Sequence, residues 1–239
     1  MALLEISHLT RTFGGLRAVS NVSFGVEAGE ILGLIGPNGA GKTTVFNLIT
    51  GFLRPTSGQI RLNGESIVGR RPHTVTRRGI TRTFQIVKPF PHLTVRENAA
   101  LAALVRLGTR AAARAESERV LEQVGLANKL DTLASDLTLS EQKRMEIARA
   151  LATGPKLLLL DEPLGGLNAS EIGPACELIQ HIRDGGVTIV LVEHVMKAIM
   201  RISHRVVVMS QGEKIADAVP TDIVNNPAVI AAYLGKRVA

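Results

Sequence analysis

The strongest constraint on the fold is a glycine-rich segment near the N-terminus, Gly36-Pro37-Asn38-Gly39-Ala40-Gly41-Lys42-Thr43. It matches the phosphate-binding loop pattern G-x-x-x-x-G-K-[ST]. The apolar residues 31–35 before it indicate a buried strand, and residues 44–50 after it indicate the start of a helix. In that setting, the backbone N–H groups of the loop and the helix N-terminus form a phosphate site. The sequence therefore predicts that the chain binds a nucleoside triphosphate.

Two side chains of this loop have predicted roles. Lys42 is expected to reach the terminal phosphates, and the Thr43 hydroxyl to ligate Mg²⁺. A lysine at a helix N-terminus is electrostatically unfavourable unless an anion neutralises it, which argues against a glycine-rich turn that merely lets the chain pass. The predicted nucleotide-binding residues of the loop are Gly36, Pro37, Asn38, Gly39, Ala40, Gly41, Lys42, Thr43 and Thr44.

A second apolar run, residues 157–160, ends in two acids, Asp161 and Glu162. A buried strand that ends this way places both carboxylates at its carboxyl edge, where open α/β sheets bind ligands. We expect Asp161 to hold Mg²⁺ and Glu162 to orient or deprotonate the attacking water. The alternative is that they are simply polar residues at a strand end.

Composition limits the class of protein. A chain of 239 residues can form one sizeable domain, or one domain with an inserted subdomain. Cys176 is the only cysteine, which excludes a disulfide framework and a cysteine-based metal cluster. No apolar run approaches the length of a membrane span, and the N-terminus lacks a signal-peptide pattern. These features predict a cytoplasmic protein.

The net charge of +7 calls for an explanation. One interpretation is a nucleic-acid-binding face, and the other is a solvated surface near anionic lipid or an acidic partner. No aromatic residues interleave the arginines, and signatures of RNA-recognition modules and zinc fingers are absent, so nucleic acid is not an expected partner. The basic residues concentrate at Arg70, Arg71, Arg77, Arg78 and Arg82, then at Arg106, Arg110 and Arg114.

The pattern of apolar residues predicts an α/β chain with a helical insertion. Residues 3–7, 21–26 and 59–62 indicate strands, the first two in a small antiparallel sheet, and residues 95–151 indicate helices. Strands at 156–160, 187–192 and 205–209 alternate with helices at 169–182 and 194–200, which implies a mostly parallel sheet. We therefore expect a nucleotide-binding core at 1–92 and 154–239 and a helical subdomain at 93–153.

With these motifs in order, the chain resembles the ATP-binding subunit of an ABC transporter over essentially its whole length. That resemblance implies the ABC variant of the phosphate-loop NTPase fold, with ATP and Mg²⁺ as cofactors. It implies that Gln85 contacts Mg²⁺ and water and that His194 contacts the γ-phosphate. It also implies that Phe13 stacks on adenine, although a core position for Phe13 remains the alternative.

Two motifs depart from the pattern of that family. The signature loop, usually Leu-Ser-Gly-Gly-Gln, aligns here with Leu137-Thr138-Leu139-Ser140-Glu141, which has neither glycine. The resemblance implies that this loop binds the nucleotide of an opposite subunit, through Thr138, Ser140 and Glu141. Thr138 and Glu141 form a capping-box pattern, so a helix should still begin here. Leu139 should restrict close backbone approach.

The second departure is Gly166-Leu167-Asn168 in place of the more usual Ala-Leu-Asp of the D-loop. Together with the segments 11–16, 82–85 and 225–235, it makes the chain similar to the ATPases of bacterial uptake systems for branched-chain, hydrophobic amino acids. Urea or amide import and lipopolysaccharide export are the transport alternatives, and a soluble nucleic-acid-associated ABC ATPase is the alternative of another class.

The resemblance also implies an assembly. The expected partners are two membrane-spanning permease subunits, a second ATPase subunit that is identical or different, and, indirectly, a periplasmic substrate-binding protein. The expected location is the cytoplasmic face of the bacterial inner membrane. Segment 86–93, just after Gln85, is the candidate groove for a permease helix, with an ordinary proline-containing connector as the alternative.

Overall fold

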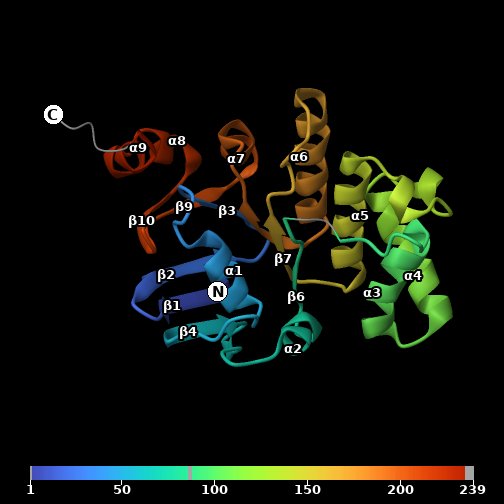
Figure 1. Cartoon of the computed structure of the whole chain (residues 1–239), viewed down its shortest axis with the longest axis horizontal. Coiled ribbons are helices and arrows are strands. Elements are labelled where there is room, and N and C mark those ends of the chain that lie inside the picture. The colour runs from blue at the N-terminus through green and yellow to red at the C-terminus, as the bar shows by residue number, and fades with distance from the viewer. Residues whose placement is uncertain (1, 86–87, 235–239) are drawn as a thin grey trace.

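The computed structural model describes residues 2–85 and 88–234 and contains two β-sheets and a set of helices that extends to one side (Figure 1). Sheet A has the strand order β2-β1-β4-β5 and is antiparallel. Sheet B has the order β10-β9-β3-β8-β7-β6. The strands are β1 (Ala2–Phe13), β2 (Leu16–Glu27), β3 (Ile31–Ile35), β4 (Ser57–Leu62), β5 (Glu65–Ser66), β6 (Ile80–Arg82), β7 (Leu157–Asp161), β8 (Thr188–Val192), β9 (Arg205–Ser210) and β10 (Glu213–Ala218).

Sheet B is parallel except at β10, which pairs antiparallel with β9. Its central strands are buried on both faces, as parallel sheets require. Along β7, Leu157 and Leu159 pack into a core shared with sheet A and α1 (Lys42–Ile49). Leu158 and Leu160 point the other way, into a core with α5 (Leu139–Ala152) and α6 (Ala169–Asp184). Successive leucine side chains of β7 therefore point to opposite faces of sheet B and join the two cores.

The helical insertion consists of α3 (Val95–Leu107), α4 (Arg110–Gln123) and α5, with two short 3₁₀ turns between α4 and α5. Each helix begins at a threonine whose side chain accepts a hydrogen bond from the first turn, which satisfies a free N–H group. Thr94, Thr109 and Thr138 are these caps. The region predicted to be helical, residues 95–151, is thus divided into three helices, each starting at one of these threonines.

Several elements were not predicted from the sequence. The remaining helices are α2 (Pro72–Arg77), α7 (Met196–Ile202), α8 (Pro220–Val224) and α9 (Pro227–Leu234), and of these only α7 was expected. Strand β6 is only three residues long, too short to show an alternation of apolar and polar residues. Its pairing with β7 is what identifies it as a strand. Strands β1 and β2 run further than expected because they pair along most of their length. Short elements carry too few residues for a pattern to stand out.

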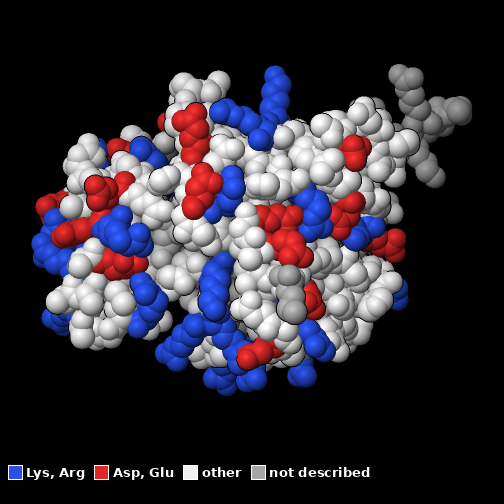
Figure 2. Space-filling model, turned by 180° about the vertical axis from the view of Figure 1, so that it is seen from behind, with Lys and Arg blue, Asp and Glu red and all other residues white. Residues whose placement is uncertain are grey.

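The basic surface differs from expectation at Arg82. Figure 2 shows Lys and Arg side chains gathered along the lower edge of the molecule and mixed with acids elsewhere. Arg70, Arg71 and Arg77, in or beside α2, are exposed. The Arg82 side chain is only 6% exposed and is ion-paired with Asp161, so its assignment to the surface cluster was wrong. The positive charge of Arg82 is therefore balanced by a buried carboxylate and not by solvent.

Asn98 in α3 organises the described part of the segment that follows Gln85. Its side chain is fully buried, and its Oδ1 accepts a hydrogen bond from the Phe90 N–H at 2.9 Å. Its amide nitrogen lies within hydrogen-bond distance of the carbonyl oxygens of Phe90, Leu93 and Thr94. This one side chain therefore fixes the backbone of residues 90–94 against the helix.

We expect Asn98→Ala to lower the free energy of unfolding by about 2 kcal/mol, because it empties a fully buried position and leaves the Phe90 N–H without its acceptor. Urea denaturation of the purified chain measures this loss. Asn128→Ala, at an exposed position, is the matched control and should change stability by less than about 0.5 kcal/mol. Equal losses in the two variants would contradict the role given to Asn98.

Candidate nucleotide site

The glycine-rich loop joins β3 to α1, and the surrounding backbone leaves no room for a side chain at two of its glycines. A Cβ at Gly36, where φ is +152°, would lie 2.1 Å from the Met209 carbonyl oxygen. A Cβ at Gly41, where φ is +101°, would lie 2.5 Å from the Ala18 carbonyl oxygen. Strands β9 and β2 therefore press the loop into its shape, with the start of α1 directly behind it.

The Lys42 ammonium lies against its own loop. Its Nζ donates to the carbonyl oxygens of Gly36 at 2.7 Å and Pro37 at 3.1 Å. Burial lowers its pKa, and the nearby carboxylates of Glu162 and Asp161 oppose that shift. The cation is thus held at a helix N-terminus, where it repels the helix dipole and would be stabilised by an anion.

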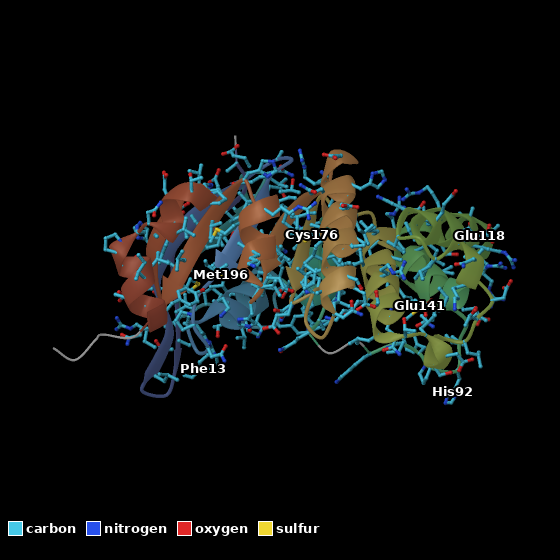
Figure 3. The ribbon with its side chains drawn as sticks, turned by 90° about the horizontal axis from the view of Figure 1, so that it is seen from above. Phe13, His92, Glu118, Glu141, Cys176 and Met196 are labelled. Carbon is cyan, nitrogen blue, oxygen red and sulfur yellow. The ribbon has the colours of Figure 1, made fainter. Side chains whose placement is uncertain are left out.

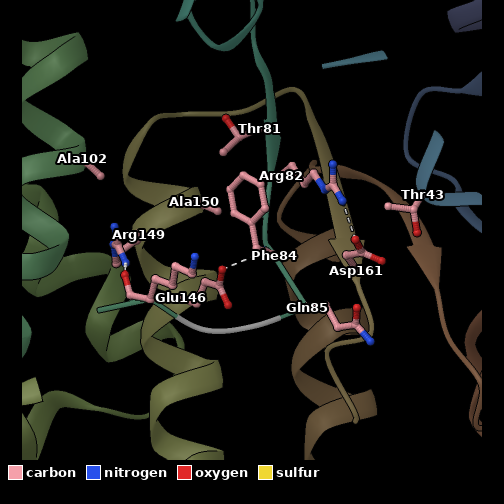
Figure 4. Close-up of a pocket in the computed structure, with 11 residues that line it drawn as sticks. Thr43, Thr81, Arg82, Phe84, Gln85, Ala102, Glu146, Arg149, Ala150 and Asp161 are labelled. Atoms are coloured by element: carbon pink, nitrogen blue, oxygen red, sulfur yellow. Dashed lines mark hydrogen bonds and ion pairs between the residues drawn. The ribbon is translucent and has the colours of Figure 1, made fainter. Parts of the chain in front are cut away.

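Asp161 ends β7 and is almost fully buried. Its Oδ2 lies 2.6 Å from the Arg82 guanidinium (Figure 4). Its backbone N–H donates to the Thr83 hydroxyl at 3.2 Å. Arg82 also donates to Asn47 of α1, and its guanidinium lies over the rings of Phe46 and Phe84. The orientation of the carboxylate is therefore set by strand β6. The sequence contained no signal for this pair beyond an arginine three residues before Gln85.

Glu162 is the point at which the three predicted catalytic residues meet. Its Oε2 accepts a hydrogen bond from Gln85 Nε2 at 2.7 Å, and its Oε1 lies 2.7 Å from His194 Nε2. An ionised carboxylate can only accept, so His194 Nε2 is the donor when Glu162 is charged. Glu162 has a φ of +52°, which is unusual for a residue with a side chain and is typical of functional sites.

These residues surround a hollow of about 470 Å³ beside the loop. Glu162, Gln85 and His194 line it together with Ala18 and the loop residues Asn38, Gly39, Ala40, Gly41, Lys42, Thr43 and Thr44. The three predicted Mg²⁺ ligands, Thr43, Gln85 and Asp161, line an adjoining cavity of about 630 Å³ (Figure 4). A hydroxyl, an amide and a carboxylate are oxygen donors of the kind that Mg²⁺ prefers, so this set fits the ion.

Phe13, at the end of β1, is 40% exposed, and the Arg11 guanidinium lies 4.4 Å from its ring centre. It is not a core residue, so that alternative was wrong. Figure 3 shows Phe13 and Glu141 far apart along the length of the molecule. The signature residues and Phe13 of one chain therefore do not approach the same nucleotide.

The signature loop starts α5 with the expected capping box. The Glu141 N–H donates to the Thr138 hydroxyl at 3.3 Å, and a Glu141 carboxylate oxygen accepts from the Thr138 N–H at 2.9 Å. The hydrogen bond from the Thr138 N–H to the carboxylate, with smaller contributions from the Thr138 hydroxyl and from Lys129 at 3.3 Å, lowers the pKa of Glu141. Thr138, Ser140 and Glu141 line a cavity shared with α6 rather than the hollow beside the glycine-rich loop.

The two departures from the family pattern touch one another. Leu139 of the signature loop lies over Gly166 of the D-loop, where a Cβ would come 2.9 Å from Leu139 Cδ2. Gly166 also has a φ of +78°, which favours glycine. The leucine occupies the space that a side chain at position 166 would take. One contact thus links the bulky signature residue to the glycine of the D-loop.

We expect Gly166→Ala to cost about 1 kcal/mol through its positive φ, and more while Leu139 is present. A double-mutant cycle with Leu139→Ala, measured by urea denaturation, should give a coupling of about 0.5 kcal/mol or more. Gly186→Ala is the matched control, since Gly186 has a φ of +93° and open space around its Cα. A cost at Gly166 that is the same with and without Leu139 would refute the contact.

Comparison with known proteins places the chain in a family. The family described as ABC transporter matches residues 19–165, and that described as branched-chain amino acid ATP-binding cassette transporter matches residues 213–239. BraF of Pseudomonas aeruginosa and LivG of Escherichia coli K12, both named high-affinity branched-chain amino acid transport ATP-binding proteins, are 44% identical. Each match covers 98% of both chains.

Solved structures of ABC transporter cassettes have the same fold as this chain. The ADP conformation of MJ1267, an ATP-binding cassette of an ABC transporter, gives a TM-score of 0.90 at 27% identity and covers 99% of this chain and all of its own. The dimeric structure of MJ0796, a bacterial ABC transporter cassette, gives 0.81 at 25% identity, covering 91% and 98%. The chain therefore belongs to the ABC transporter family, as an ATP-binding protein.

Proposed function

We propose that this protein is the subunit that hydrolyses ATP to power import of branched-chain or other hydrophobic amino acids. The observation that carries the hydrolytic part is the meeting of Gln85, Glu162 and His194 beside the glycine-rich loop. The substrate rests on the near-complete match to BraF and LivG, whose names state branched-chain amino acid transport. No residue of this subunit is assigned a contact with the transported molecule.

The loop amides and Lys42 hold the phosphates in this proposal. The ammonium already points at the loop interior, where a phosphate replaces the carbonyl oxygens as its partner. Thr43, Gln85 and Asp161 would hold Mg²⁺, which when bound offsets the charge that develops on the phosphates. Arg82 fixes one oxygen of Asp161 and leaves the other available. Phe13 stacks on adenine with the ring face that Arg11 does not cover.

Glu162 takes the proton of the attacking water, or orients that water for attack. Gln85 and His194 fix its two carboxylate oxygens from opposite connectors. This arrangement holds the carboxylate in one position before the reaction begins, which lowers the cost of reorganisation. His194 is 47% exposed on its side chain, so it is accessible to the γ-phosphate that the resemblance assigns to it.

The second half of each hydrolysis site comes from another ATPase subunit, identical or different. The dimeric cassette among the structural neighbours supports such pairing. Thr138, Ser140 and Glu141 then face the partner's nucleotide. Because the Glu141 charge is held in the capping box, the helix N–H groups remain the main donors of this half-site. Leu139 restricts how closely the partner's phosphate approaches.

Two permease subunits complete the transporter, with a periplasmic binding protein as an indirect partner. Among the described residues, none of the helices is long and apolar enough to cross a membrane. In this proposal, the permease contacts the exposed aromatic rings of Phe84, which lines the 630 Å³ cavity, and Phe90, which stacks on Arg149 in the wall of that cavity. Of the expected groove at 86–93, Ile86 and Val87 lie outside the described residues.

Glu162→Gln tests the proposed base. The amide cannot take a proton, so the rate of ATP hydrolysis should fall by about 10²- to 10⁴-fold while ATP still binds. ATP-dependent dimers, followed by size-exclusion chromatography, should last longer. Glu177→Gln, at an exposed position, is the control. Hydrolysis near the wild-type rate, with dimers no longer-lived, would show that Glu162 is not the base.

Phe90→Ser tests the docking surface. Removing this exposed ring, which is 48% exposed and stacks on Arg149, should reduce recovery of the chain with its two permease subunits by about tenfold, which corresponds to roughly 1.4 kcal/mol of contact energy. Val224→Ser, at a position that is 53% exposed at the end of α8, is the control. Equal recovery of both variants would place the permease elsewhere.

A further inference from the structure

Glu193, the residue before His194, is a buried acid that the proposed reaction leaves unused. It is 2% exposed. Its Oε1 accepts a hydrogen bond from the Leu164 N–H at 2.6 Å, and its Oε2 accepts from the N–H groups of His194 at 2.8 Å and Val195 at 3.2 Å. A charged carboxylate is buried only when it is well paired, so this group has a structural purpose.

These bonds join two separate connectors. Leu164 follows β7 and lies two residues after Glu162, whereas His194 and Val195 follow β8. One carboxylate therefore spans the two segments that carry the base and the histidine. Glu162 also donates its own N–H to Val192 at 2.8 Å, which ties the same connectors at their start. Glu162 Oε1 and His194 Nε2, which lie 2.7 Å apart, are thus carried by connectors that are attached to one another at two places.

Lys143 approaches the same place from the helical insertion. It lies one turn into α5, is 8% exposed, and its Nζ donates to the Glu162 carbonyl oxygen at 2.8 Å. Burial lowers its pKa, while the facing acids Glu193, Glu146 and Glu162 oppose that change. The ammonium therefore binds the residue whose φ is positive and supplies a positive charge near Glu193.

We propose that Glu193 and Lys143 are positioning residues for hydrolysis, with Glu193 holding the base and the histidine together and Lys143 linking the signature helix to the backbone of the base. The inference rests on the proposed roles of Glu162 and His194. Neither residue touches the nucleotide hollow, whose lining includes Glu162 and His194 but not Glu193 or Lys143. Their substitution should therefore affect turnover and leave nucleotide binding intact.

Steady-state ATP hydrolysis by the purified chain tests this. Glu193→Gln replaces one acceptor oxygen by a donor that opposes the backbone N–H groups, so kcat should fall about 10²-fold, as expected for a small displacement of the reacting groups. KM for ATP, and calorimetric affinity for ADP, should change less than about twofold, because uniform binding is untouched. Lys143→Met should lower kcat about tenfold, and Lys143→Arg, which keeps a charged donor, should recover most of that loss.

Glu177→Gln and Lys197→Met, the same changes at exposed positions, are the controls. A folded Glu193→Gln protein with kcat within about twofold of wild type would overturn the proposal, and so would parallel losses of kcat and ADP affinity. If Glu193→Gln does not fold, an unchanged kcat in Lys143→Met, or a loss that Lys143→Arg does not recover, overturns it instead. Glu162→Gln is assayed alongside: an active Glu162→Gln refutes the proposed base, whereas an inactive one with active Glu193→Gln refutes only this inference.

Discussion

The parallel pairing of β3, β8 and β7 is the constraint on which the site depends. Parallel strands end at the same edge of a sheet, so the loops that follow them meet there. The glycine-rich loop follows β3, Glu162 follows β7, and His194 follows β8. Residues far apart in the chain thus reach one hollow. Burial of both faces of these strands in separate cores holds the strands, and so the hollow, in place.

Buried charge is concentrated at that edge and is paired throughout the part of the chain described. Arg82 holds Asp161, backbone N–H groups hold Glu193, and carbonyl oxygens hold Lys42. An unpaired charge in such surroundings would cost several kcal/mol, so each pairing fixes the position of a buried polar group. The site is therefore set by its supporting residues before a nucleotide enters.

The departures in the signature loop and the D-loop become one feature in the folded chain. Leu139 and Gly166 lie almost thirty residues apart, and neither explains the other in the sequence. In the structure, the side chain of the first fills the space above the second. A loop without the usual glycines is thereby seated on its own D-loop through an apolar contact.

The sequence by itself determined the nucleotide loop and the parallel core, because Gly36–Thr43 and the apolar run into Asp161 and Glu162 are local patterns. Gln85 and His194 were identified through the resemblance to the family, and their roles in the reaction stay predictions. The capping box of Thr138 and Glu141 was also predicted correctly from a local pattern. Only the tertiary structure decided that Arg82 is buried, that Glu193 spans two connectors, and that Lys143 reaches Glu162 from α5. Those contacts join residues from different strands and helices, so their geometry depends on packing that no local pattern encodes.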